Sequence, residues 1–493
     1  MTGTSILTRF APLPSRWPAI WPRGKPPVRP DLHTLWLQPR LLPNASQSPT
    51  VERILDLLGP LDWPRFPDRD LQRNWGQPTV PYAGLAAAFL LMLNEALRSM
   101  SSLRRFLVEH PGFIWAFGFP LIPAARHPGR FDPAASLPTQ RYLTQLLRSL
   151  PNGALQFLLA DSTRLILQEL AALGISAGDC ISLDTKHILA WVKENNPKTH
   201  VPDRYDKTKQ PAGDPDCRLG CKCRHNRHDK EPAQLSTPTK NPVPAQPADY
   251  GEYYWGYGSG VVVTKVPGWG EFVIAELTQT FDQPDVSYFF PLMATVEQRL
   301  GKRPRCGTFD AAFDAFYVYD YFHRPGDPSC FAAVPFSEKG GYKAKGRQFS
   351  PNGSPKCAAG LPMSLKMTFL DRTRAIIEHE RGKYVCPLLY PQPNGQSCPI
   401  NHKNWPRKGC TADMPTSPGA RLRYTLDRDG EAYQAAYRQR TAVERINSQA
   451  LALGIERPHW RNGQAIANQN TLIYTLINLR FLQRLRKRQP AAD

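Results

Sequence analysis

The sequence predicts an α/β protein in which a mixed sheet is flanked by helices and preceded by a helical domain. Residues 49–174 carry apolar side chains at three- and four-residue spacing, which is typical of amphipathic helices. From residue 175 onward, short β-branched and apolar segments alternate with helical runs, as in α/β units. The chain has 493 residues, of which 41% are hydrophobic, and this is enough for two or three folded units with real cores.

Five segments carry the helical periodicity, and the residues before them lack it. The segments are VERILDLLG, YAGLAAAFLLMLNEALRSM, SLRRFLVEHP, TQRYLTQLLRSL and ALQFLLADSTRLILQELAALG. The preceding residues are rich in Pro, Arg and Trp without any period, so we interpret them as a poorly ordered arm. The sequence therefore predicts an arm at 1–48 and a helical domain at 49–174.

The predicted sheet begins after residue 174. The segment ISLDTKHILAWV at 181–192 indicates a strand, and GSGVVVTKV and EFVIAELTQTF indicate a hairpin closed by the turn at 267–270. A helix (VSYFFPLMATVEQRL), a short strand (CGTFD), a helix (DAFYVYDYFHR) and a strand (FAAVPF) follow. Polar stretches with Pro and Cys at about 193–250 and 337–430 are expected to be loop-rich insertions. Two helical runs close the predicted α/β domain at 175–480, and a basic tail is expected at 481–493.

The charge of the chain indicates a polyanionic partner. The formal net charge is +20, which makes nucleic acid the first expectation. Two interpretations of the helical domain stay open: its basic faces recognise DNA ends, or it is an ordinary bundle with solvated arginines. The C-terminal residues Arg484, Arg486 and Lys487 are open in the same way. They are expected to contact DNA backbone, yet cations also stabilise a helix C-terminus without DNA.

Composition and pattern exclude a membrane span and do not support secretion. The longest apolar stretch, at 85–93, is well short of the roughly 20 residues that a spanning helix needs. The N-terminus lacks an apolar segment followed by a cleavage site. The ten cysteines cluster with histidines, which favours metal binding or reduced thiols over disulfides. We therefore expect a cytoplasmic protein.

Two acids stand where strands are expected to carry catalytic carboxylates. Asp184 lies inside an apolar strand, where an acid is costly unless it is paired or binds a metal. Asp310 ends the short strand CGTFD and opens a turn of small residues. Asp314 competes with Asp310 for this role, and either acid also suits a helix N-cap. The alternative for Asp184 is an edge strand that turns the carboxylate to water.

The third acid, Glu444, lies on a helical segment with other polar residues. Residues Tyr437, Arg440 and Glu444 fall on one helix face, so a carboxylate, a guanidinium and a phenol are presented together. Such a face suits metal binding by Glu444 and phosphate contacts by Tyr437 and Arg440, and we assign Arg445 to DNA as well. The alternative is a solvated face with Arg–Glu pairs.

These three elements together resemble the insertion-sequence DDE transposases. The run YRQRTAVERINSQ is similar to the family's Tyr-x2-Arg-x3-Glu element, SLDTK to its first-Asp strand, and GTFDAAFDA to its second-Asp strand and turn. The elements occur in the family's order, with 126 residues between the first two acids and 134 between the last two. One departure is Leu451, which stands where the fuller family pattern has a lysine, so the subgroup is in doubt.

The resemblance implies a ribonuclease-H-like catalytic domain and a transposition reaction. Asp184, Asp310 and Glu444 would be the catalytic metal ligands for two Mg²⁺ or Mn²⁺ ions, since hard cations prefer carboxylate oxygens. Water would cleave a phosphodiester at the transposon end, and the freed 3′-OH would join target DNA. The implied partners are double-stranded terminal repeats and target DNA, with a homodimer on DNA and a bacterial, nucleoid-associated location. The alternatives are an inactive, domesticated DNA-binding protein and a nuclease on the same fold.

Two clusters of cysteine and histidine are expected either to hold structural Zn²⁺ or to be reduced thiols. The first comprises Cys217, Cys221, Cys223 and His225, whose spacing does not match a standard zinc finger. The second comprises Cys386, Cys398, His402 and Cys410, within the second predicted insertion. Bound zinc would stabilise segments that have little apolar material of their own. A group of aromatic residues at 250–257 is expected to pack in a core or to stack on unpaired bases.

Overall fold

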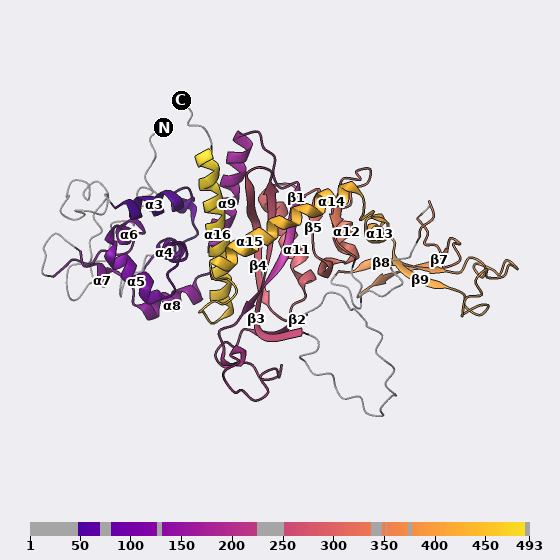
Figure 1. Cartoon of the computed structure of the whole chain (residues 1–493), viewed down its shortest axis with the longest axis horizontal. Coiled ribbons are helices and arrows are strands. Elements are labelled where there is room, and N and C mark those ends of the chain that lie inside the picture. The colour runs from indigo at the N-terminus through magenta and orange to yellow at the C-terminus, as the bar shows by residue number, and fades with distance from the viewer. Residues whose placement is uncertain are drawn as a thin grey trace.

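The computed structural model describes residues 48–69, 80–125, 131–223, 251–336, 348–351, 353–372 and 377–488. Three parts follow one another along the long axis: a lobe of helices, a central six-stranded sheet with helices packed on it, and a small three-stranded sheet (Figure 1). The fold is therefore mixed α/β, as the sequence predicts. The predicted arm at 1–48 lies, apart from its last residue, outside the described residues.

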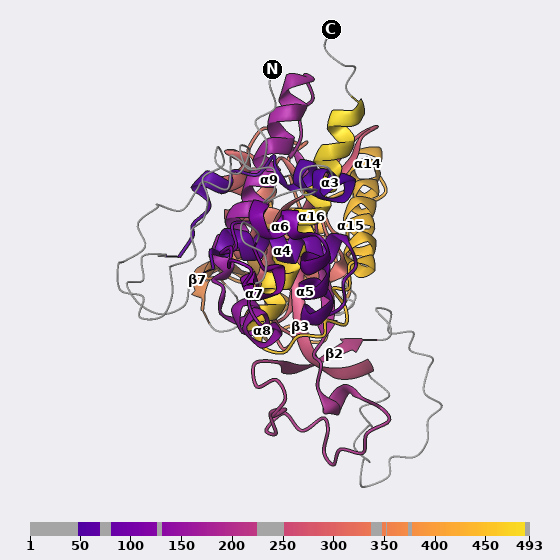
Figure 2. The ribbon, with the colours of Figure 1, turned by 90° about the vertical axis from the view of Figure 1, so that its left-hand side faces the viewer.

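The first part is a helical lobe built around one buried helix. Its elements are α3 (Pro49–Leu58), η2 (Trp63–Arg65), α4 (Tyr82–Asn94), α5 (Met100–Glu109), α6 (Pro111–Ala116), α7 (Pro133–Ser136) and α8 (Gln140–Ser149). The sequence of α4 is apolar all round, and its residues 83–92 are buried. Figure 2 shows α4 in the middle of the lobe, with α3, α5, α6, α7 and α8 around it.

The central sheet is curled and mixed. Its strands are β1 (Cys180–Leu189), β2 (Arg218–Cys223), β3 (Gly251–Val266), β4 (Gly270–Thr280), β5 (Cys306–Thr308) and β6 (Phe331–Ala333). The strands β4, β3 and β1 are antiparallel neighbours, and β5 and β6 continue from β1 in parallel. β3 and β4 form the predicted hairpin, whose turn uses positive φ angles at Gly268 and Gly270. The strand that carries Asp184 is thus central, which excludes the edge-strand alternative.

Helices cover both faces of this sheet. The remaining helical elements of this part are α9 (Asn152–Ala172), η3 (Lys193–Asn195), η4 (Asp285–Tyr288), α11 (Phe289–Leu300), η5 (Ala311–Phe313), α12 (Phe316–Phe322), α14 (Glu431–Tyr437), η7 (Arg438–Arg440), α15 (Thr441–Ala452) and α16 (Gly463–Arg488). Alternate residues of β3 serve different cores: Val262 packs in the cluster with α11 and α12, whereas Val261 and Val263 pack in the cluster with α15.

Helix α16 joins the lobe to the sheet. It is 26 residues long and is buried over most of its length. Its residues Leu472 and Leu476 belong to the core of the lobe, whereas Ile473 and Ile477 belong to a core of the sheet. Figure 1 shows it standing between the two parts.

Three boundaries differ from the expectation. The second insertion contains an antiparallel sheet of β7 (Ser364–Asp371), β8 (His379–Val385) and β9 (Thr411–Pro415), followed by α13 (Pro418–Thr425). The first insertion contributes β2, which extends the central sheet by pairing with β3. Short strands interrupted by Gly, Pro and Cys give a weak sequence signal, so the pattern alone predicts loops in both insertions. The third difference concerns residues 481–488 of the predicted basic tail, which continue α16 and bury Phe481, Leu482 and Leu485.

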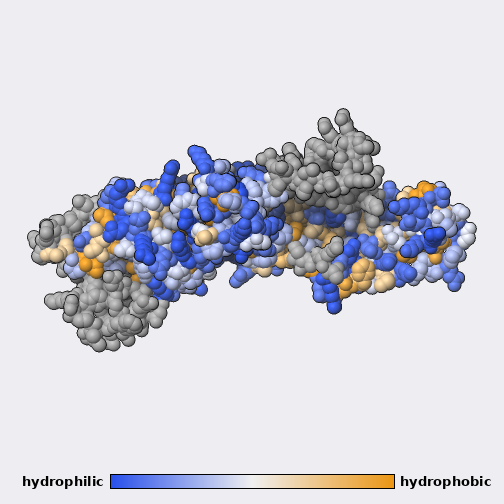
Figure 3. All heavy atoms as spheres, turned by 90° about the horizontal axis from the view of Figure 1, so that it is seen from below, coloured by the Kyte–Doolittle hydropathy of each residue, from blue (hydrophilic) through white to orange (hydrophobic). Residues whose placement is uncertain are grey.

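The helices and the surface of the described residues have two further properties. No helix among the described residues is both long enough and apolar enough to cross a membrane. The face seen in Figure 3 is mainly hydrophilic, with hydrophobic residues in small scattered areas.

Candidate active site

The parallel register of β1 and β5 brings Asp184 and Asp310 together. Ser182 pairs with Thr308, and the Thr308 hydroxyl donates to Ser182 Oγ at 2.7 Å. Side chains two residues further along a strand point to the same face, so the next pair on this face is Asp184 and Asp310. Asp310 itself follows β5 and accepts from the backbone N–H of Ala312 at 2.9 Å. It therefore caps η5 and lies beside Asp184.

The pKa values of these two acids report their crowding. Burial raises the pKa of Asp184 to about 6, the nearby charge of Arg440 lowers it, and the charges of Asp310 and Asp285 raise it. Burial also raises the pKa of Asp310, and the charge of Asp285 adds to the rise. Like charges held this close favour the binding of a proton or a cation.

Arg440 lies between the sheet acids and the helix acid. Its Nη1 donates to Glu444 Oε1 at 2.6 Å, and its Nη2 lies 3.9 Å from Asp184 Oδ2. The Glu444 side chain is 55% exposed, compared with 18% for Asp184, so Glu444 reaches the site from its open side. Glu444 therefore forms the Arg–Glu pair that was the alternative to metal binding, and it lies next to Asp184 and Asp310 through Arg440.

Segment η7 fixes Arg440 against the strand. The Ser182 hydroxyl donates to the carbonyl oxygen of Gln439 at 3.2 Å, which ties η7 to β1. Tyr437 ends α14 and stacks on Tyr433 with ring centroids 5.8 Å apart. Burial raises the pKa of Tyr437, the charge of Arg440 lowers it, and the charges of Asp310, Glu444 and Asp184 raise it. The structure thus brings together five residues that the sequence assigned to one site.

A third acid, Asp285, joins Asp184 and Asp310, and the sequence analysis missed it. Its Oδ1 accepts from the Thr185 hydroxyl at 2.7 Å, and its charge acts on both sheet acids. Segment η4 contains both Asp285 and Tyr288, and the ring of Tyr288 packs closely on Gly260 of β3. A Cβ added at Gly260 would lie 2.4 Å from this ring, so a side chain there would push η4 away. Gly260 pairs with Thr185 in the sheet, so this glycine lets η4 approach the acids. The available signal was an acid at the start of a helical run directly after the hairpin.

Asn447 is a second polar residue that the sequence analysis missed. It lies three residues after Glu444 on α15, and its Nδ2 donates to Asp184 Oδ2 at 3.1 Å. Its Oδ1 and the Nε of Arg440 are buried without a hydrogen-bond partner among the described residues. Unsatisfied polar atoms are rare in folded cores, and a pair of them here indicates a site built to contact something further.

Asp314, the rival of Asp310, has a structural role. Its side chain is fully buried, and both carboxylate oxygens accept from Arg423, at 2.9 and 2.8 Å. The Tyr319 hydroxyl donates to it as well, at 2.8 Å. An acid neutralised in this way holds α12 to α13, which leaves Asp310 as the second acid of the site.

The structure describes only part of the first predicted zinc cluster and brings together two cysteines of the second, Cys386 and Cys410. Cys217 is buried and its thiol donates to the carbonyl oxygen of Asp214 at 3.1 Å, while Cys221 lies on β2. The Cys223 side chain and His225 lie outside the described residues. In the second cluster, Cys410 contacts Cys386 and also Cys357, which the sequence analysis did not include, and burial raises the Cys410 pKa to about 12. Within the second cluster, His402 Nδ1 accepts from the backbone N–H of Asn404 at 3.2 Å, and Cys398 is a free thiol.

The remaining predicted DNA contacts lie on helices, and two of them have acidic partners. Arg445 pairs with Glu271 on β4 at 3.0 Å, and Arg486 pairs with Glu169 on α9 at 2.7 Å. Arg484 lies over the ring of Phe481, and Lys487 is exposed on the last turn of α16. Of the aromatic residues at 250–257, Tyr254, Trp255 and Tyr257 lie on β3 and are buried in the core, Tyr253 is half-buried, and Tyr250 lies outside the described residues.

The chemistry of the site follows from several carboxylates that surround the guanidinium of Arg440. Within the described ranges, no group of three or more His, Cys, Asp or Glu side chains is arranged so that it could hold a metal ion. The carboxylates of Asp184, Asp310 and Asp285 carry hard oxygens, the kind of ligand that Mg²⁺ or Mn²⁺ prefers, but as placed they do not converge as one metal site, and Glu444 faces Arg440. Comparison with protein-family models, with curated proteins and with solved structures gives no match for this chain.

Proposed function

We propose that this chain is a DNA transposase that cleaves transposon ends and joins them to target DNA on a ribonuclease-H-like core. The observation that carries the proposal is the placement of Asp184, on β1, beside Asp310, which directly follows the parallel neighbour β5, next to Arg440 and Glu444 of the η7–α15 segment. The mixed sheet with helices on both faces supports the core assignment. The proposed partners are double-stranded terminal repeats and target DNA, with a homodimer on DNA, and the proposed location is the bacterial cytoplasm at the nucleoid.

The acids fit a divalent cation by their chemistry. Asp184 and Asp310 would hold it from two strands, and Glu444 would join them when Arg440 turns from its carboxylate to a DNA phosphate. Bound Mg²⁺ or Mn²⁺ would activate the attacking oxygen and stabilise the leaving oxygen. Asn447 would orient the Asp184 carboxylate, and Tyr437 would contact the DNA backbone next to it. The same arrangement would serve hydrolysis at the transposon end and then attack by the freed 3′-OH.

Asp285 offers a second choice for the third carboxylate. It already lies with Asp184 and Asp310, whereas the Glu444 oxygen is engaged by Arg440. The two choices differ in what their removal does. If Glu444 is the third ligand, Glu444→Gln abolishes cleavage and Asp285→Asn weakens it; if Asp285 is the ligand, the order is reversed.

The test is strand cleavage and joining on the DNA that flanks the chain's own reading frame, with and without Mg²⁺. Wild-type protein is expected to cut at inverted repeats only with the metal, and Asp310→Asn to abolish the cut. Asp282→Asn removes an exposed acid three residues from Asp285 and serves as the matched control. Full cleavage by Asp310→Asn would overturn the proposal, and preference for RNA or branched DNA would point to a nuclease.

A second candidate function is DNA binding without cleavage. The 2.6 Å contact between Arg440 and Glu444 favours it, because a helix acid that stays paired cannot serve a metal. This candidate predicts salt-dependent DNA binding with no metal-dependent cut in the same assay.

A further inference from the structure

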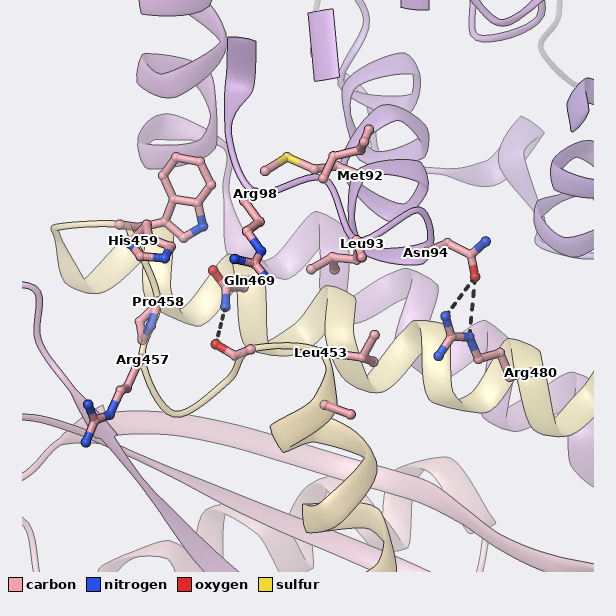
Figure 4. A pocket seen from close by; sticks show the side chains of 15 residues that line it. Met92, Leu93, Asn94, Arg98, Leu453, Arg457, Pro458, His459, Gln469 and Arg480 are labelled. Atoms are coloured by element: carbon pink, nitrogen blue, oxygen red, sulfur yellow. Dashed lines mark hydrogen bonds between the residues drawn. The ribbon is translucent and has the colours of Figure 1, made fainter. Parts of the chain in front are cut away.

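A pocket of about 470 Å³ lies where the helical lobe meets the C-terminal helices. One wall is the turn between α4 and α5, and the other is the connection from α15 to α16 together with one face of α16 (Figure 4). Pockets of this size hold small ligands or a part of a larger one. It is separate from the acids of the proposed active site, which do not line it.

The lining of the pocket is cationic. Arg98, Arg457, Arg480 and His459 line it, and no Asp or Glu does. Two acids outside the wall act on these arginines, and both are already paired: Glu95 acts on Arg480 and pairs with Arg53 at 2.9 Å, and Glu456 acts on Arg457 and pairs with Lys186 at 3.0 Å. Three guanidinium groups without a carboxylate in their wall favour an anion as the occupant.

Two of these arginines are available and one is held in place. Arg480 donates to Asn94 Oδ1 from Nε and Nη2, at 3.3 and 3.0 Å, so α16 and α4 fix its guanidinium (Figure 4). Arg98 and Arg457 are exposed, and neither forms a hydrogen bond or an ion pair with the part of the chain that the structure describes. A ligand phosphate would give these two side chains the partners that the protein itself does not supply.

A strip of aromatic and basic side chains leads from the pocket to the end of β1. Trp460 and His459 line the pocket, His459 lies edge-on to Trp191 at 5.7 Å, and the Arg461 guanidinium lies 4.8 Å above the Trp191 ring. Trp191 is 52% exposed and follows the strand that carries Asp184. Exposed aromatic rings interleaved with arginines suit a sugar–phosphate chain with bases, and a free anion would use only the pocket.

We propose that this pocket binds a backbone phosphate of the substrate DNA and so couples the helical lobe to the catalytic sheet. The proposal rests on the proposed function. Leu453 directly follows α15 and lines the pocket. The distance along the helix axis from Glu444 to Leu453 is about 14 Å, because each helical residue adds about 1.5 Å. One strand of a DNA duplex advances about 3.4 Å per phosphate, so the bound phosphate lies about four nucleotides from the cut.

The experiment measures DNA binding without cleavage, in the Asp184→Asn chain, as a function of salt concentration. The Arg98→Gln/Arg457→Gln pair is expected to lower the slope of log K against log salt by about 0.9 for each phosphate that the protein no longer neutralises, and the affinity by about tenfold. Its matched control is Arg141→Gln/Arg148→Gln, which removes the same charge from exposed positions on α8 that do not line the pocket. An equal decrease in affinity in both double variants would overturn the proposal.

A second arm locates the bound phosphate and separates the two proposals. In this arm, an uncharged methylphosphonate replaces the DNA phosphate about four nucleotides from the cut. The replacement is expected to weaken DNA binding by the chain that keeps Arg98 and Arg457, and to have no further effect on binding by the Arg98→Gln/Arg457→Gln variant. Binding of inorganic phosphate alone, with unchanged DNA affinity in the variant, would overturn the DNA assignment. If cleavage requires Asp184 but the Arg98→Gln/Arg457→Gln variant binds DNA normally, only the proposal for the pocket is refuted. Weakened binding by the variant, with no cleavage by wild type, refutes only the proposed function.

Discussion

The central sheet buries carboxylates in two regions, and the regions treat them differently. On β4, Glu276 is 4% exposed and accepts from Gln156 at 2.7 Å and from the Thr471 hydroxyl, with Arg299 nearby. On β1 and after β5, Asp184 and Asp310 share one arginine and crowd against Asp285. One acid completes a satisfied polar network. The others form a group in which several carboxylates share the single guanidinium of Arg440, and this difference separates a structural acid from a catalytic candidate.

The largest expected difference between the two regions is in activity. Asp184→Asn should lower metal-dependent strand cleavage by at least about 1,000-fold, or about 4 kcal/mol of transition-state stabilisation. The same change should slightly raise stability at pH 7, because it removes a largely buried charge beside like charges. Glu276→Gln should keep cleavage per folded molecule. The measurement is the rate of strand cleavage per folded molecule for each variant. Equal decreases in Asp184→Asn and Glu276→Gln would contradict the distinction between the two regions.

The reverse difference is expected in stability. Glu276→Ala removes the shortest hydrogen bonds of the Gln156 amide and the Thr471 hydroxyl, which keep only longer contacts, and it leaves the buried Arg299 without its acid; each such loss costs about 1–3 kcal/mol. We expect the free energy of unfolding to fall by about 3–4 kcal/mol. Urea denaturation of the variant beside Asp282→Asn measures it, and a fall below about 1 kcal/mol would show that the network is not structural.

Stability should also depend on pH through Glu276. Burial raises the pKa of Glu276 from 4.5 to about 7, while its hydrogen bonds to Thr471 and Gln156 and the charge of Arg299 lower it. The folded state therefore keeps a proton that the unfolded state releases, so this stability is present below pH 4.5 and is lost as pH rises through 7. The decrease is about 3 kcal/mol. The free energies of unfolding of wild type and Glu276→Gln should differ by a changing amount as pH rises from 4.5 through 7. A difference that stays constant with pH would contradict the assignment.

Asp184 and Asp310 were predictable from the sequence because each interrupts or ends a strand. Glu444 was predictable from a helix face expected to carry Tyr437 and Arg440, although the structure divides this run into α14, η7 and α15. Asp285 was not, because its role depends on Gly260, which is 25 residues earlier and lets Tyr288 approach β3. The choice between Asp310 and Asp314 needed Arg423, more than 100 residues away. The sheet β7–β8–β9 escaped prediction because β7 is mostly exposed and lacks a regular alternation of buried and exposed residues.

The smallest effect tests the departure at Leu451. This side chain is 48% exposed on α15, two turns after Glu444, so Leu451→Lys should cost little stability. If DNA follows α15, the new cation should steepen the salt dependence of binding by about 0.9 in the log–log slope. Leu365→Lys, a similarly exposed leucine on β7, is the control. An equal change at both sites would indicate general attraction and not a contact along α15.

Helix α16 has a consequence for how this protein is made. Its residues fill gaps in the core of the lobe and in two cores of the sheet, yet they are synthesised after every other described element. Until α16 has been synthesised, the lobe and the sheet each have an open apolar face that none of the earlier described elements covers. Glu444 and Arg440 lie on the elements shortly before α16. A nascent chain therefore cannot assemble the group of acids into a finished site before these elements have been synthesised.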